Sequence, residues 1–171
     1  MDVRDPIHGN LPLLDAEVAV LDSKAYQRLR AIKQLGFSEF SFPGATHNRY
    51  LHSLGVSHLA GIAFDSIFAK FSFSSLASRE RLRQTVRLAA LLHDIGHGPL
   101  SHASEEVMPP LKDLKVGVYL KRSVKPADDA QANHEDYTIK FTGQLHAGAN
   151  DLPYLPAAAV LWFEFCQAEY R

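Results

Sequence analysis

The chain has 171 residues, of which 46% are apolar, 22% charged and 10% aromatic, a composition typical of one compact globular domain rather than of a disordered or fibrous protein. It carries one cysteine and no stretch near 18 consecutive apolar residues, so we expect no internal disulfide, no membrane span and a reducing, cytoplasmic location. The formal net charge of −1 at pH 7 argues against a broad basic surface for nucleic acid.

Helical patterns fill the first half of the chain. Strong helix formers that follow two capping residues predict a helix over 24–35. The next loop contains Phe37, Phe40 and Phe42, for which core packing, a base pocket or a subunit contact are the possible roles. Apolar residues that recur at three- to five-residue steps then predict a long amphipathic helix over 46–71.

A second long helix is predicted over 79–94, after a serine-rich break. Its end, 88–92, is apolar almost all round, which indicates a central position, and the glycines and proline at 96–99 terminate it. The remaining predicted segments are a short helix over 99–107, an irregular excursion over 112–133 in which 116–120 could form a strand, a helix over 134–142, a loop over 143–153 and a last helix over 156–169. The predicted fold class is all-α, in one domain.

Histidines concentrate the titratable chemistry in one third of the chain, since six of the nine lie between positions 47 and 102. His93 and Asp94 fall at the end of the predicted central helix, where burial of a carboxylate requires an ionic partner or a cation. If that helix continues, His97 lies about 40° from His93 around its axis. Without a cation, His93 would be a hydrogen-bonded core histidine and Asp94 the cap of a neighbouring helix.

His52, on the preceding long helix, strengthens the case for a cation site. Two antiparallel helices joined by a short break can bring His52 opposite His93 and Asp94. Two imidazole nitrogens and a carboxylate oxygen suit Zn, Fe, Mn or Ni better than Ca, and three protein ligands leave positions for water, as in catalytic sites. Taken alone, His52 would be an ordinary core or surface histidine.

Five sequence motifs follow one another along the chain. They are DPIHG at 5–9, QRLRAIKQLG at 27–36, FPGATHNRYLHSLGVSHLAG at 42–61, HDIGHGPLSH at 93–102 and HED at 134–136. In this order the motifs resemble the HD-superfamily phosphohydrolases, specifically the branch of the deoxynucleoside-triphosphate triphosphohydrolases. The resemblance implies a helical HD-domain bundle with its core over 1–142, followed by a short helical tail over 143–171 without a recognisable motif.

The resemblance also implies a role for each matching residue. A divalent Fe, Mn, Zn, Ni or Mg ion would be bound by His52, His93 and Asp94. His102 would act as general acid or base at the scissile phosphate, with Glu105 as its acidic partner. The other implied residues are the active-site histidines His97 and His134, the phosphate-contacting Arg49, the sugar- and base-contacting Gln34 and Leu35, and, in nucleotide-activated homo-oligomeric relatives, a guanine-nucleotide site at a subunit interface with Asp22, Gln27 and Arg30.

The family pattern includes a fourth metal ligand, an aspartate from a helix well downstream of the His-Glu motif. None of the later acids stands in that motif, and they are Glu135, Asp136, Asp151, Glu164 and Glu169. Either one of them substitutes, or three protein ligands and water hold the metal, or this is a shortened form that binds metal weakly because one negative charge is missing.

We therefore predict a metal-dependent phosphohydrolase that converts a deoxynucleoside triphosphate to deoxynucleoside and triphosphate. Arg28, Lys33 and Arg49 are candidate counter-charges for the triphosphate, although surface ion pairs are an alternative role for each. The alternative functions are a phosphodiesterase or phosphomonoesterase on the same metal site and a non-catalytic nucleotide-binding or regulatory oligomer. Nucleic-acid binding through the basic residues between 112 and 125 is disfavoured by the near-zero net charge.

Overall fold

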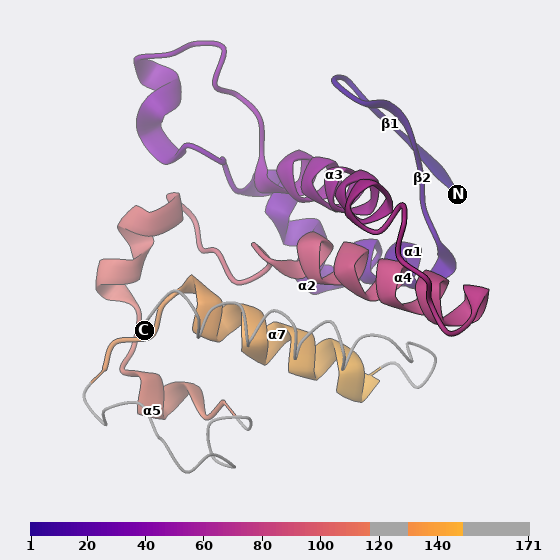
Figure 1. Cartoon of the computed structure of the whole chain (residues 1–171). Helices are drawn as coiled ribbons and strands as arrows, with labels where there is room; N and C mark the ends of the chain where they lie inside the picture. Colours follow the sequence, from indigo (N-terminus) through magenta and orange to yellow (C-terminus); the bar gives the residue numbers. More distant parts are fainter. Residues whose placement is uncertain (117–129, 149–171) are drawn as a thin grey trace.

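A computed structural model describes residues 1–116 and 130–148, which form a helical assembly with one β-hairpin at the N-terminus (Figure 1). In chain order the elements are β1 (Asp2–Asp5), β2 (Gly9–Pro12), α1 (Asp15–Leu21), α2 (Lys24–Gln27), the 3-10 helices η1 (Arg28–Ala31) and η2 (Gly36–Phe40), α3 (Arg49–Ile67), α4 (Leu76–Leu92), the 3-10 helix η3 (Ser101–Val107), α5 (Leu111–Leu114) and α7 (His134–Gly148). The predicted all-α class is confirmed. Among the described residues, no helix is long and apolar enough to cross a lipid bilayer.

The N-terminal hairpin is an element that the sequence patterns did not predict. Its two strands pair antiparallel, with Asp5 opposite Gly9 at the turn. The Asp5 Oδ1 atom accepts hydrogen bonds from the backbone N–H groups of Ile7 and His8, both at 2.8 Å, and Gly9 adopts a φ of 76° that glycine tolerates. Each strand has only four residues, too few to give a recognisable alternating pattern.

The helix predicted over 24–35 is wrong in its length. Helical structure ends at Ala31, and the backbone beyond it is extended. Lys33 forms an antiparallel bridge with Asn48, and the N–H of Gln34 donates to the backbone just before α3. This tertiary pairing overrides the helix propensity of the segment and places Gln34 beside Ser101.

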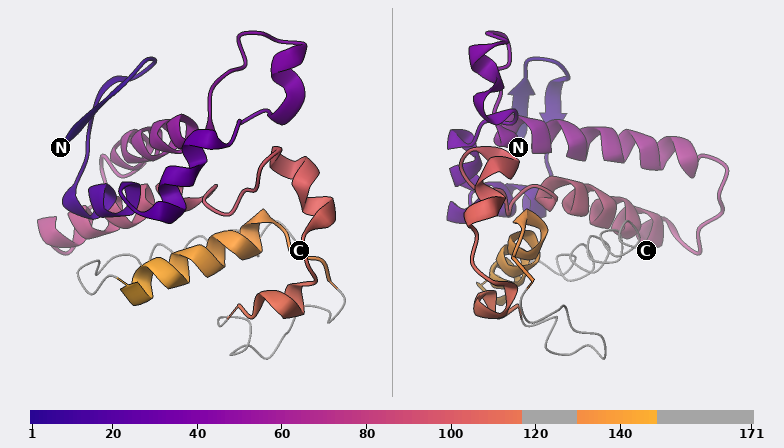
Figure 2. Two further views of the ribbon diagram at one scale, coloured as in Figure 1. Left: turned by 180° about the vertical axis from the view of Figure 1, so that it is seen from behind. Right: turned by 90° about the vertical axis from the view of Figure 1, so that its left-hand side faces the viewer.

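The segment between η1 and α3 projects from the bundle (Figure 2, left). Its aromatic side chains Phe37, Phe40 and Phe42 are 58%, 80% and 69% exposed. Core packing, one of the three predicted roles, is therefore wrong for all three. A base pocket or a subunit contact stays a prediction.

The two long helices form the antiparallel pair that the sequence predicted (Figure 2, right). Asn48 caps α3 because its Oδ1 accepts the N–H of Leu51 at 3.0 Å, and Ser75 caps α4 in the same way, three residues earlier than predicted. The Ser57 hydroxyl donates to the carbonyl of Arg87 at 3.0 Å and ties the helices together. The first turn of α3 consequently lies beside the last turn of α4.

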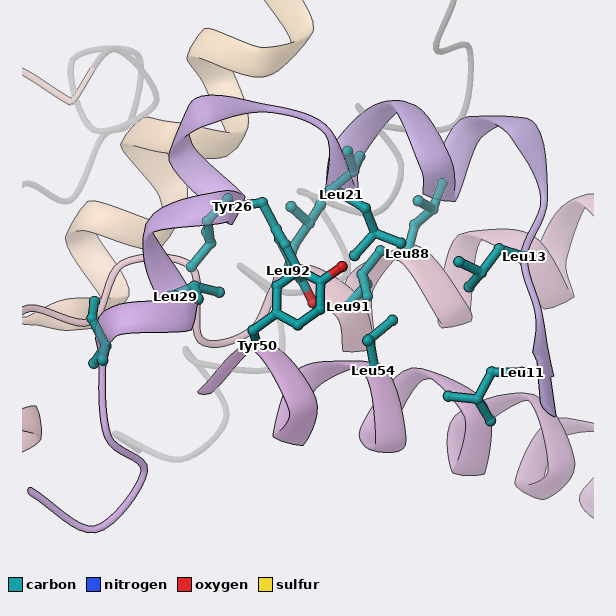
Figure 3. Close-up of a cluster of buried hydrophobic side chains, with 13 residues drawn as sticks. Leu11, Leu13, Leu21, Tyr26, Leu29, Tyr50, Leu54, Leu88, Leu91 and Leu92 are labelled. Atoms are coloured by element: carbon teal, nitrogen blue, oxygen red, sulfur yellow. The ribbon is translucent and has the colours of Figure 1, made fainter. Parts of the chain in front are cut away.

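The hydrophobic core lies between α1, α2, η1, α3 and α4 (Figure 3). Leu88, Leu91 and Leu92 are at most 2% exposed, so the predicted central position of this helix end is confirmed. The buried members of the core are Leu11, Leu13, Val20, Leu21, Tyr26, Leu29, Ile32, Tyr50, Leu54, Leu88, Leu91, Leu92 and Ile95. Phe141 and Leu145 of α7 pack against it, which fixes α7 next to the end of α4.

Three predictions for the second half of the chain need correction. The segment predicted as a helix over 99–107 forms the 3-10 helix η3 from residue 101, and the short α5 occupies the start of the predicted irregular excursion. The loop predicted from residue 143 begins later, because α7 continues to Gly148 and packs Leu145 on the core. The predicted helix over 156–169 and most of the excursion lie outside the described residues.

Candidate active site

The end of α4 and the first turn of α3 place the predicted metal ligands. His93 is the C-cap of α4, and the chain then turns tightly, with the N–H of Ile95 bonded to Leu92 at 3.0 Å and that of His97 bonded to Asp94 at 3.1 Å. This turn projects the polar side chains that follow the apolar end of α4 toward α3 and α7.

Three ligand atoms converge between the two helices. The Nε2 atoms of His52 and His93 are 3.3 Å apart, and Asp94 Oδ2 lies 3.3 Å from His93 Nε2 and 3.6 Å from His52 Nε2. Ligand atoms about 2.0–2.2 Å from a tetrahedral ion are about 3.3–3.6 Å apart, so this spacing and donor set fit a divalent transition metal. His93 Nδ1 lies 2.7 Å from the carbonyl of Ala90, a contact that orients Nε2 toward the cluster.

Arg49 lies against the same carboxylate. It is 2% exposed, its Nη1 donates to Asp94 Oδ2 at 2.5 Å, and its Nη2 donates to the Ser101 hydroxyl. Burial would raise the pKa of Asp94, but hydrogen bonds from His93 and His97 and the charge of Arg49 outweigh it and hold that pKa well below its usual range. Asp94 is therefore ionised, as a metal ligand must be.

The four residues predicted as catalytic form a second cluster next to the first. The ring of His97 stacks on that of His134 at 3.8 Å between centroids, and the ring of His102 stands edge-on to His97. Glu105 Oε1 lies 2.9 Å from His102 Nδ1 and 2.7 Å from His134 Nδ1, so one carboxylate orients two imidazoles. This arrangement can hold and deliver a proton.

Asp94 connects the two clusters. Its Oδ2 belongs to the three-ligand group, and its Oδ1 lies 3.4 Å from His97 Nε2. Burial lowers the pKa of His97 to about 4, and burial also lowers the pKa values of His52 and His134. Their imidazoles are thus neutral near pH 7, which suits both metal binding and proton acceptance.

The turn after α4 is held from two sides by residues to which the sequence assigned no role there. Thr138 of α7 donates to the carbonyl of His93 at 3.2 Å and accepts the N–H of Gly96 at 2.9 Å. From the other side, the Arg28 guanidinium donates to two backbone carbonyls, including that of His97 at 2.5 Å. Thr138 carried no sequence signal, because its role arises only when α7 meets this turn.

The three predicted counter-charges occupy different environments. Arg28 binds the backbone of the turn, Arg49 pairs with Asp94, and Lys33 lies at the surface with its Nζ 2.9 Å from Glu39. The surface ion pair predicted as an alternative role therefore describes Lys33, and Arg28 has a structural role instead. Arg49 is the basic residue that the structure brings into the site.

A pocket of about 320 Å³ lies beside His102, lined by Gln34, Leu35, Phe37 and the segment 100–103. Leu35 is 48% exposed, and the Gln34 side-chain oxygen is buried without a hydrogen-bond partner among the described residues. The pocket thus offers a mainly apolar surface beside His102, as contact with a sugar or base would require.

The residues predicted for an allosteric nucleotide lie along the segment from the end of α1 to η1. Asp22 is the exposed C-cap residue of α1, and Gln27 Oε1 accepts a hydrogen bond from Arg30 Nε at 2.8 Å. The Arg30 guanidinium also stacks over the ring of Tyr50 at 3.7 Å. Binding of a second nucleotide by this set stays a prediction.

In the part of the chain that the structure describes, the cation cluster has no fourth ligand, the position that the family pattern fills with an aspartate. Glu135 and Asp136 are not in the cluster, and Asp136 Oδ2 accepts the N–H of Asn133 at 2.9 Å at the start of α7. The later acids lie outside the described residues. Substitution by one of the later acids, one of the three predicted alternatives, stays a prediction.

Lowering the pH is expected to destabilise the metal-free protein. Burial depresses the pKa of His97 to about 4 from 6.5, so the folded state binds fewer protons than the unfolded chain between these values. The free energy of unfolding is therefore highest above pH 6.5, where His97 is neutral in both states, and it decreases as the pH falls toward 4. In chelator-treated protein, urea denaturation should show a loss on the order of 2 kcal/mol from pH 7 to pH 4.5. His97→Asn should flatten this dependence, and an unchanged slope would contradict the assignment.

Comparison with known proteins gives a consistent result. A family model described as "HD domain" matches residues 49–146. The chain is 40% identical over 139 residues, 81% of its length, to a protein of Dictyostelium discoideum named deoxynucleoside triphosphate triphosphohydrolase SAMHD1 homolog, and 46% identical over 100 residues, 58% of its length, to human deoxynucleoside triphosphate triphosphohydrolase SAMHD1. It is also 39% identical over 103 residues, 60% of its length, to an uncharacterised protein of Methanocaldococcus jannaschii. The matches cover only 24%, 16% and 20% of these relatives.

Proposed function

Because the family match covers more than half of its length, the chain belongs to the HD-domain family, and we propose that it is a metal-dependent phosphohydrolase that acts on nucleotides. The finer proposal is hydrolysis of a deoxynucleoside triphosphate to deoxynucleoside and triphosphate. The observation that carries it is the pair of clusters joined through Asp94, one suited to a cation and the other to proton transfer.

The chemistry requires water to add to the α-phosphorus while the bond to the 5′ oxygen breaks and that oxygen takes up a proton. A divalent cation held by His52, His93 and Asp94 would supply charge stabilisation and lower the pKa of bound water. His102 would deliver the proton to the 5′ oxygen, with its Nδ1 oriented by Glu105 at 2.9 Å. The pocket at Gln34 and Leu35 would receive the sugar and base next to His102.

The printed names of the Dictyostelium and human relatives support the choice of substrate, since both are deoxynucleoside triphosphate triphosphohydrolases. The match to the Dictyostelium relative covers 139 of the 171 residues, so it must extend past residue 134 and includes both clusters. Assembly as a homo-oligomer, cytoplasmic location and activation by a second nucleotide stay predictions.

Within residues 1–116 and 130–148 the cation cluster has three ligands, which favours a second candidate, a nucleotide-binding or regulatory module without catalysis. A site with one carboxylate fewer than the family pattern should bind a divalent cation less tightly. A phosphodiesterase or phosphomonoesterase would use the same cation cluster, and differs from the finer proposal in the bond that is cleaved.

Product analysis in ¹⁸O-labelled water tests the proposal. The full chain, loaded with Mn²⁺ or Fe²⁺, is incubated with each deoxynucleoside triphosphate, and a chelator-treated sample serves as the control. We expect deoxynucleoside and triphosphate in equal amounts, with the label in triphosphate because water attacks phosphorus. Nucleoside monophosphate with pyrophosphate would contradict the finer proposal, and nucleotide binding without any product would favour the non-catalytic module.

A further inference from the structure

Ser101 occupies an unusual backbone position directly before His102 of the second cluster. Both Leu100 and Ser101 adopt positive φ values, 68° and 59°, although neither is glycine. Such strained residues persist only where the surrounding structure holds them, and they gather at functional sites. His102 follows directly, so the direction in which its imidazole points depends on this turn.

The surroundings of Ser101 hold it through its hydroxyl group. Ser101 is 7% exposed, its Oγ accepts a hydrogen bond from Arg49 Nη2, and it donates to the carbonyl of Gln34 at 3.4 Å. The neighbouring Gly36 lets the chain approach closely, because a Cβ there would lie 3.3 Å from the carbonyl oxygen of Leu100. One hydroxyl thus bonds to two segments that are distant in sequence.

These contacts form a continuous connection across the site. Arg49 uses its other terminal nitrogen on Asp94, which lies in the cation cluster, and Gln34 lines the pocket beside His102. The Ser101 carbonyl accepts the Ser104 hydroxyl at 2.7 Å, which starts the 3-10 helix that carries Glu105. Ser101 is therefore bonded toward the cation cluster and toward the pocket, and it precedes the proposed proton donor.

We propose that Ser101 is a positioning residue that sets the distance and direction of His102 relative to the cation cluster, an inference that rests on the proposed function. Ser101 itself need not touch the substrate. Its hydroxyl fixes Arg49 against Asp94 and holds the left-handed turn that aims the His102 imidazole.

The kinetics of Ser101→Ala test this inference in the full, metal-loaded chain. We expect kcat to fall about 10- to 100-fold, as for other residues that orient site groups, with bound metal and KM changed less than about threefold. Ser57→Ala is the matched control, because Ser57 is also buried and donates to a backbone carbonyl at 3.0 Å, but lies between α3 and α4. Its kcat should equal that of the wild type. The assays are run at a temperature below the unfolding midpoints of the wild type and of Ser101→Ala. A kcat of Ser101→Ala within twofold of the wild-type kcat would overturn the proposal.

A second measurement separates this inference from the proposed function. The imidazole NMR signals of His102 in the metal-free protein need no activity, and we expect Ser101→Ala to shift them while Ser57→Ala does not. Ser101→Gly should shift them too, because it relieves the backbone but removes the hydroxyl. Unshifted His102 signals in both Ser101 variants would overturn the inference. Absence of hydrolysis in the wild type would instead reject the proposed function alone.

Discussion

Replacing Asp94 with asparagine is expected to remove bound metal and to reduce nucleotide hydrolysis by at least about 10³-fold, because the charge stabilisation given by a cation is worth several kcal/mol. The variant should also lose about 3–5 kcal/mol of stability, since Arg49, only 2% exposed, would keep a buried charge without its partner. Metal analysis of the purified protein, product formation and urea denaturation measure the three effects. Near-stoichiometric metal in this variant would contradict the cation site.

Two further variants separate the loss of metal from the loss of folding. The double variant Arg49→Gln, Asp94→Asn neutralises both partners and should regain part of the lost stability while still lacking metal. Glu17→Gln is the matched control. Glu17, on α1, is a fully buried carboxylate whose Oε1 lies 2.6 Å from Arg87 Nε on α4. This variant should be destabilised to a similar extent yet retain metal. Equal metal loss in this control would show that damage to the fold explains the result.

The sequence predicted the long elements of the fold because their patterns are local. The antiparallel pair α3 and α4 follows from apolar periodicity and a serine-rich break, and its packing brings His52 beside His93 as the sequence indicated. The helix predicted over 24–35 was wrong in its length because its structure is not decided locally. Its residues favour a helix locally, but pairing of Lys33 with Asn48, a contact distant in sequence, decides its structure. The short hairpin gave too few residues for any pattern.

The candidate site, like the fold, was predicted from the sequence only in part. His93 and Asp94 were found in sequence because a histidine and a carboxylate at the end of an apolar helix need a partner, whereas the roles of His97, His102, Glu105 and His134 came from the family resemblance. The structure gathers these residues, with His52, into the two clusters. The residues that hold them in place were not found. Arg28 and Thr138 act on backbone atoms of the turn after α4, and such roles depend on which segment packs there rather than on residue type. Ser101 lay inside the motif at 93–102, but its position at a positive φ is visible only in the structure.

Gly96→Ala is expected to be the most destabilising alanine substitution among the described glycines. A Cβ at Gly96 would lie 1.9 Å from the carbonyl oxygen of His134 and 2.3 Å from the backbone nitrogen of Thr138, so no side-chain rotation relieves the overlap. Overpacking against movable side chains lowers the free energy of unfolding by about 1–3 kcal/mol, and overlap with backbone atoms should lower it by more than about 3 kcal/mol. Urea denaturation measures the loss, and stability equal to the wild type would contradict the close approach of α7 to this turn.

Gly143→Ala provides the matched control, because the same methyl group is added in α7 at a place where no atom of the described residues outside the helix's own backbone lies within 4 Å. There the substitution should stabilise the protein by about 0.5–1 kcal/mol, as alanine favours a helix over glycine. If Gly96→Ala folds, the start of α7 must move away from α4, and the 2.7 Å contact between His134 and Glu105 should break. Loss of that contact would shift the imidazole NMR signals of His134. Those signals should stay in place in Gly143→Ala, because that methyl group overlaps no atom of the described side chains.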